Sequence, residues 1–221
     1  MKCSDCSKTV RPVVAIDIDG TLGDYHSHFL RFASLYLGKH DGYLDALGYT
    51  GHPSLKAWFL RQTGADGRTW NDIKLAYRQG AQKRTMPVYN GASTLVQSVM
   101  EAGAEVWLTT TRPYLRLDNI DPDTRVWLAR HAIPYEGLLY DDGKYEALAS
   151  RVDKQRVVAV LDDLPEEIEA AESVFGRGVP LLRRQRYNTW WWEAHANWYA
   201  QTLVDAERQI TQRVEDWYAH E

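Results

Sequence analysis

The stretch VVAIDIDGT, residues 13–21, decides how the rest of this chain is interpreted. Its first four residues are apolar and mostly β-branched, which is typical of a strand buried on both faces of a parallel sheet. Asp17 and Asp19 follow, and because one residue separates them they point the same way from an extended backbone. Open α/β sheets bind ligands at the carboxyl ends of their strands. The stretch therefore predicts a binding site at the end of the first strand.

The same stretch indicates what such a site binds. Paired carboxylates repel each other unless a cation or a shared proton offsets their charge, and oxygen ligands of this kind hold Mg²⁺ in proteins. Gly20 follows directly, and a glycine lets the chain turn sharply and brings backbone N–H groups close to an anion. The turn predicts a bound metal ion, or a carboxylate with a shifted pKa, beside an anion-binding loop.

The composition fits a single domain of ordinary size. The chain has 221 residues, 44% of them hydrophobic and 25% charged, and a formal net charge of −4 argues against a surface that attracts nucleic acid as a whole. No apolar run is long enough to span a membrane, and the polar start does not resemble a signal peptide. The two cysteines, Cys3 and Cys6, lie in residues 1–11, which we expect to be a flexible tail. We expect a soluble, cytoplasmic protein.

Alternating apolar runs and helical spacings predict the fold class. After the first strand, about sixty residues show helical spacing only, and strands and helices then alternate. This order predicts an α/β fold with a Rossmann-like, doubly wound, parallel five-stranded sheet. The expected strands cover residues 13–16, 105–109, 138–140, 157–161 and 179–182.

The helical stretch predicts a small cap inserted after the first strand. We expect residues 12–23 and 87–190 to form the core and residues 24–86 to form the cap, above the carboxyl edge of the sheet, where it can act as a lid. Residues 191–221 contain a long helical pattern whose apolar positions form one stripe. That stripe packs either on the protein's own core or on a second copy in a homodimer.

Three further groups converge on the first strand's acids, because parallel strands all end at one edge of a sheet. The second strand ends in the hydroxyls of Thr109–Thr111, the fourth ends in Asp162 and Asp163, and Lys144 lies near a helix start between them. Carboxylates hold a divalent cation, while hydroxyls and an ammonium bind phosphate oxygens. The combination predicts a site for a phosphoryl group.

These four motifs, in this order, resemble those of the haloacid dehalogenase superfamily, and the resemblance spans about residues 12–190. It implies a Rossmann-like core and Mg²⁺-dependent phosphatase activity through an aspartyl-phosphate. Asp17 would be the nucleophile and a metal ligand. Asp19 would be the general acid and base, with its backbone carbonyl at the metal. The chemistry agrees, since a carboxylate nucleophile divides hydrolysis into two displacements and the second needs a base.

The resemblance assigns the remaining site residues by motif. Thr110 would bind a phosphate oxygen, with Thr111 as the alternative, because three threonines leave the register open. Gly20 would contribute to phosphate binding, and Lys144 would neutralise both the nucleophile and the phosphate. We favour Asp163 over Asp162 as the direct metal ligand.

The stretch MPVYNGA, residues 86–92, and the later Arg186-Tyr187-Asn188 resemble the 5′-nucleotidase (deoxyribonucleotidase) branch of that superfamily. The resemblance implies nucleoside monophosphates as substrates, with the base stacked on aromatic residues of the cap. Tyr25, Trp58 and Phe59 are candidates for this stacking, although packing inside the cap is the alternative for each. Arg112 is a further candidate substrate contact, and that branch often has no charge there.

Two alternatives stay open. The first is a polynucleotide 3′-phosphatase, because residues 124–128 and 133–135 also resemble the phosphatase domain of polynucleotide kinase, and the arginines and tryptophans of residues 183–192 suit a nucleic-acid end. A large insert over the site argues against long strands as substrates. The second is a non-catalytic nucleotide-binding or assembly protein, against which the intact acids, threonine and lysine argue.

Overall fold

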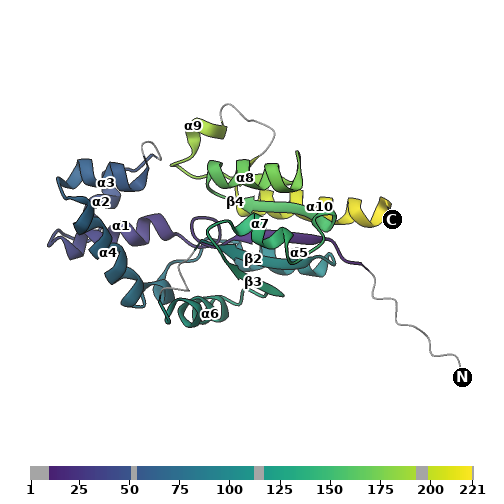
Figure 1. The fold of residues 1–221 in the computed structure, drawn as a ribbon, viewed down its shortest axis with the longest axis horizontal. Helices are drawn as coiled ribbons and strands as arrows, with labels where there is room; N and C mark the ends of the chain where they lie inside the picture. Colours follow the sequence, from purple (N-terminus) through teal and green to yellow (C-terminus); the bar gives the residue numbers. More distant parts are fainter. Residues whose placement is uncertain (1–9, 51–53, 112–116, 193–198, 221) are drawn as a thin grey trace, which may run out of the picture.

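The computed structural model describes residues 10–50, 54–111, 117–192 and 199–220. Within them a single six-stranded sheet has the order β3-β2-β1-β4-β5-β6, and every neighbouring pair is parallel (Figure 1). The strands are β1 (Val13–Asp17), β2 (Glu105–Thr110), β3 (Gly137–Tyr140), β4 (Val157–Asp162), β5 (Pro180–Arg183) and β6 (Tyr199–Ala200). The expected parallel α/β sheet is confirmed, but the expected count of five strands is wrong. The sixth is a two-residue edge strand, too short to show a periodic pattern.

Helices cover both faces of the sheet because successive residues of a strand face opposite sides. Val14 and Ile16 of β1 belong to the hydrophobic cluster that includes α5, α6 and α10, whereas Val13 and Ala15 belong to the cluster that includes α7 and α8. These helices are α5 (Ala92–Glu101), α6 (Ile120–Arg130), α7 (Lys144–Ala149), α8 (Pro165–Phe175) and α10 (Leu203–His220). The first strand therefore lies at the centre of the molecule.

The inserted helices pack around a hydrophobic cluster of their own. They are α1 (Tyr25–Tyr36), α2 (Tyr43–Ala46), α3 (Leu55–Thr63), α4 (Gly67–Gln79) and the 3₁₀ turn η1 (Gln82–Thr85), and we call them the cap. They lie together at the left of Figure 1, at the end of the molecule away from the last turns of α10. Asp66 caps α4 by accepting a hydrogen bond from the N–H of Thr69.

The long C-terminal helix packs on the protein's own core. Leu203, Ala206, Ile210 and Val214 of α10 are at most 2% exposed and join the cluster of β1 and α5. The apolar stripe, which we expected to pack either on the core or on a second copy, is therefore buried within one chain. A short helix, α9 (Thr189–Trp192), precedes it. Among the described helices, none combines the length and apolar character needed to cross a bilayer.

Candidate active site

The chain turns at the end of β1 in a conformation that only glycine adopts readily. Gly20 has φ +101°, and a Cβ at this position would lie 2.3 Å from Oδ2 of Asp163. The carboxylate of Asp163 therefore packs directly against the glycine backbone. This contact joins the loop after β1 to the loop after β4 and brings Asp163 close to Asp17.

Three buried carboxylates meet at this edge of the sheet. One oxygen each of Asp17, Asp162 and Asp163 lies within 4.8 Å of the others. Lys144, the first residue of α7, is 1% exposed and places its Nζ 2.7 Å from Oδ1 of Asp17 and 2.5 Å from Oδ2 of Asp162. The structure thus brings together the acids of the first and last motifs and the lysine between them.

Burial of these acids shifts their titration. Burial raises the pKa of Asp17 well above its ordinary value, and the charges of Asp162 and Asp163 raise it further, while Lys144 opposes the shift. Burial and the neighbouring Asp162 raise the pKa of Asp163 to about 7, against hydrogen bonds from Tyr187 and Thr21. One ammonium and three carboxylates leave an excess of negative charge in the described part of the site, so a divalent cation suits it.

The two aspartates after β4 differ in their partners. Oδ2 of Asp162 accepts from the hydroxyl of Tyr145 as well as pairing with Lys144, and Oδ1 accepts from the N–H of Leu164 at 3.0 Å. Asp163 accepts one hydrogen bond on each oxygen, from Thr21 at 2.9 Å and from Tyr187 at 2.7 Å. A carboxylate has about four lone-pair directions, so Asp163 keeps more of them for a metal ion.

Sequence reasoning gave Tyr187 and Asn188 no role in holding the site. Besides the hydroxyl of Tyr187, the side-chain amide of Asn188 donates to the backbone oxygen of Asp163 at 2.8 Å. The ring of Tyr187 also contacts His26 of the cap, with 4.0 Å between ring centroids. The only indication of these roles in the sequence was the family resemblance of the Arg-Tyr-Asn stretch, which gave no physical reason for a contact with Asp163.

Asp19 has a partner that sequence reasoning missed. Lys83, in η1 where the cap returns to the core, forms an ion pair with Oδ2 of Asp19. The lysine side chain is 4% exposed and that of Asp19 is 19% exposed. Nothing in the spacing of residues 80–87 marks Lys83, because its role depends on a contact across sixty-four positions.

The threonines occupy the end of the second strand. Thr109 lies opposite Asp17 in the strand register, Thr110 is the last residue of β2 and 1% exposed, and Thr111 is exposed. The hydroxyl of Thr109 is buried and has no hydrogen-bond partner among the residues that the structure describes. Arg112 lies outside those residues.

A cavity of about 240 Å³ lies between the cap and the core, next to this site. Tyr25 lines it, as expected for a substrate contact, together with His26, Tyr49, Trp70, Lys74 and Tyr187. Trp58 and Phe59 do not line it. They are 4% and 0% exposed and belong to the hydrophobic cluster of the cap, so the expectation that they stack on a substrate is wrong for this structure.

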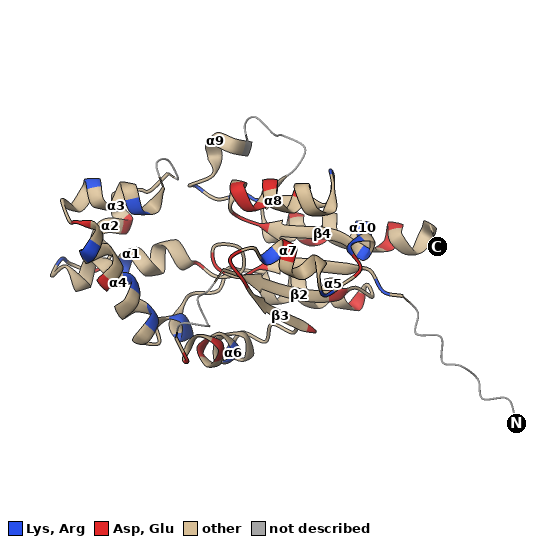
Figure 2. Cartoon of the chain, in the orientation of Figure 1, with Lys and Arg blue, Asp and Glu red and all other residues tan. Residues whose placement is uncertain are grey.

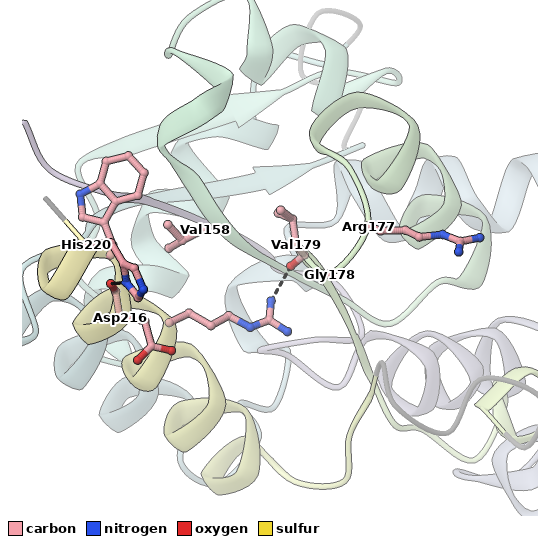
Figure 3. A pocket seen from close by; sticks show the side chains of 8 residues that line it. Val158, Arg177, Gly178, Val179, Asp216 and His220 are labelled. Atoms are coloured by element: carbon pink, nitrogen blue, oxygen red, sulfur yellow. Dashed lines mark hydrogen bonds between the residues drawn. The ribbon is translucent and has the colours of Figure 1, made fainter.

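A larger cavity, of about 610 Å³, lies elsewhere, as Figure 3 shows. It is lined by Val158 near the start of β4, by Val179 just before β5, and by the C-terminal turns of α10. Those residues belong to the amino ends of the strands, whereas the three carboxylates lie at or just after the carboxyl ends. This cavity is therefore separate from the candidate active site.

Part of the arginine and tryptophan segment packs on the core. Arg183 donates to the backbone oxygens of Arg184 and Gln201, and Trp191 is 5% exposed in a cluster with Ile168 and Leu182. Side chains engaged in this way do not form an open surface for stacking bases. Trp190, in contrast, is 50% exposed and lines the cavity between the cap and the core, so the nucleic-acid alternative stays a prediction.

Several solved structures share this fold. No family model and no curated protein matches the chain. A predicted phosphatase from Clostridium acetobutylicum is 13% identical with a TM-score of 0.62, and the alignment covers 92% of this chain and 100% of that one. CbbY from Rhodobacter sphaeroides, in complex with phosphate, is 20% identical with a TM-score of 0.57, over 88% and 96%.

A haloacid dehalogenase-like family hydrolase from Streptococcus pneumoniae is 12% identical, with a TM-score of 0.57 over 89% of this chain and 96% of that one. At these identities the likeness is one of fold. The chain therefore has the fold of haloacid dehalogenase-like hydrolases, as its four motifs led us to expect.

Proposed function

We propose that this protein is a Mg²⁺-dependent phosphomonoesterase of the haloacid dehalogenase superfamily that acts through an aspartyl-phosphate. The supporting observation is the buried carboxylate of Asp17 at the end of β1, against Lys144 and within reach of Asp163. This is an arrangement of hard oxygen ligands and one ammonium that suits a phosphoryl group and a cation together.

The reaction divides into two displacements. An oxygen of Asp17 forms a bond to phosphorus while the bond to the leaving oxygen breaks, and that oxygen keeps the electron pair and takes a proton from Asp19. Water then attacks the phosphorus, Asp19 accepts a proton from it, and the bond to Asp17 breaks. Asp17 and Asp163 would hold Mg²⁺, which supplies positive charge opposite the transferring oxygens. Lys144 balances the charge of Asp17, and Thr110, the last residue of β2, would bind the phosphate.

The cavity between the cap and the core is the proposed site of the leaving group. Its aromatic rings suit a planar group, which favours nucleoside monophosphates as substrates. The cap also contains nine Lys and Arg residues against five Asp and Glu, although the whole chain is acidic. A basic cap over an acidic core favours an anionic substrate between them, as Figure 2 illustrates.

A substrate panel tests this proposal. The purified protein would be offered deoxynucleoside and ribonucleoside monophosphates and small sugar phosphates, since CbbY was solved with xylulose-1,5-bisphosphate. We expect release of phosphate from nucleoside monophosphates with Mg²⁺, loss of release with a chelator, and loss in Asp17→Asn. Turnover of sugar phosphates alone would exclude the nucleotide assignment. Activity that persists in Asp17→Asn would exclude the aspartyl-phosphate.

A further inference from the structure

We infer that Lys83 is a positioning residue that holds the carboxylate of Asp19 toward the leaving oxygen of the substrate. This inference rests on the proposed function, because it concerns the acid–base step of that reaction. It assigns a specific task to a residue that lies in the connection between the cap and the core.

The surroundings of Lys83 confine its ammonium group. Its side chain is 4% exposed, and its Nζ pairs with Asp19 and lies 4.1 Å from the centroid of the Tyr25 ring. A second ring, that of Tyr77, is 5.8 Å away. A cation held by a carboxylate and two aromatic faces has little freedom to move. Tyr25 also lines the cavity proposed for the leaving group, so one aromatic ring contacts both the ammonium of Lys83 and that cavity.

The two lysines of the site face different steps of the reaction. Lys144 comes from the core and contacts Asp17 and Asp162. Lys83 comes from η1, the last turn of the cap, and contacts Asp19. The nucleophile Asp17 and the acid–base residue Asp19 therefore each have a lysine of their own, one from the core and one from the cap.

The connection that carries Lys83 is fixed by the core. The Nε of Arg84 lies 2.5 Å from Oδ1 of the fully buried Asp123 in α6. The indole of Trp127 donates to the backbone oxygen of Met86 at 2.6 Å, and Arg130 donates to that of Arg84 at 2.8 Å. Three side chains of one helix thus hold the connection on the C-terminal side of Lys83. A lysine on a connection held in this way can fix the direction of a neighbouring carboxylate.

The test compares two esters of similar shape that differ in how much they need an acid. Phenyl phosphate releases a basic phenolate, which needs a proton to leave readily. p-Nitrophenyl phosphate releases p-nitrophenolate, which is stable without one. The ratio kcat/KM reports the first irreversible step, in which the leaving group departs. We expect Lys83→Met to lower kcat/KM at least tenfold more for phenyl phosphate than for p-nitrophenyl phosphate, and Lys83→Arg to restore most of the difference.

Controls separate this role from a structural one. Lys56→Met removes an exposed lysine of the cap and should leave both values unchanged. Adding Lys83→Met to Asp19→Asn should lower kcat/KM for phenyl phosphate no further, because the lysine acts through the aspartate. An equal fall for both esters, no fall for either, or an additive double variant would overturn the inference. The proposed function is tested separately, by whether Asp17→Asn abolishes the activity of the wild type.

Discussion

At the scale of single residues, the site contains contacts so close that a larger side chain would not fit. Gly20 has no side chain because Asp163 occupies the space where one would lie. The hydroxyl of Tyr187 donates to the same carboxylate, and its ring contacts His26 of the cap. Changes at these positions therefore report on the metal site more than on the fold.

Gly20→Ala should displace Asp163, because the new Cβ would lie 2.3 Å from its carboxylate. We expect Mg²⁺ affinity to fall by about tenfold or more, measured by calorimetric titration. Gly178→Ala is the matched control, with φ +88° and nothing within 4 Å of its Cβ. The control variant introduces backbone strain but no steric clash. Equal effects of the two variants on Mg²⁺ binding would therefore show that the clash with Asp163 is not the cause.

Tyr187→Phe removes one hydrogen bond to Asp163 and keeps the ring. That bond lowers the pKa of Asp163, so its loss should raise the pKa and weaken Mg²⁺ binding by about 10- to 100-fold at neutral pH. The Mg²⁺ dependence of activity measures this effect. Tyr49→Phe, in the same aromatic group, should leave Mg²⁺ affinity unchanged.

His26 should make the protein less stable in mild acid. Burial lowers the pKa of His26 from 6.5 to about 3, so the folded state keeps it neutral while the unfolded chain binds a proton below pH 6.5. Stability is therefore present above pH 6.5 and is lost as the pH falls from there toward 3, by about 1–2 kcal/mol at pH 5. The raised pKa values of Asp17 and Asp163 act in the opposite direction, so the check is the difference between the wild type and His26→Asn in urea unfolding at pH 7 and pH 5. On going from pH 7 to pH 5, the free energy of unfolding of the wild type should fall relative to that of His26→Asn.

At the scale of elements, the ends of the helices are set mostly by residues that favour turns and caps. Pro165 is the first residue of α8 and Gly64 follows the end of α3, which are the positions that proline and glycine favour at helix ends. Asp66 caps α4, although Thr69 and Asp72 are also three residues apart, so spacing alone does not identify the cap. Ala132, just after α6, adopts φ +50°, which no pattern indicated.

Ala132→Gly should stabilise the protein, because alanine is strained at positive φ and glycine is not. We expect the free energy of unfolding to rise by about 0.5–1 kcal/mol, measured by urea titration. Ala129→Gly, inside α6, should lower it by about the same amount. A fall for both variants would show that the backbone at Ala132 is not strained.

At the scale of the whole molecule, the site joins three parts of the chain that fold against one another. The loop after β1, the loop after β4 and the start of α7 enclose three carboxylates, and the cap adds Lys83 at Asp19. Excess negative charge in such an enclosure costs stability unless a cation balances it.

Mg²⁺ should therefore raise the thermal stability of the protein. We expect an increase in Tm of several degrees at a concentration about one hundred times the dissociation constant, measured by calorimetry after dialysis against a chelator. Asp163→Asn should reduce this shift, because it removes a charged ligand, and Na⁺ at equal ionic strength should not reproduce it. An unchanged Tm would mean that the carboxylates do not hold the ion.

The sequence by itself determined the parallel sheet and the acidic residues that stand at the ends of its strands. These depend on local patterns, since an apolar strand followed by Asp-Ile-Asp-Gly carries its chemistry within a few residues. Only the tertiary structure decided that Trp58 and Phe59 are cap core, that α10 covers the sheet, and that Lys83 and Tyr187 hold Asp19 and Asp163. The reason is that burial and side-chain pairing arise between segments far apart in the chain, and no local spacing records which of them meet.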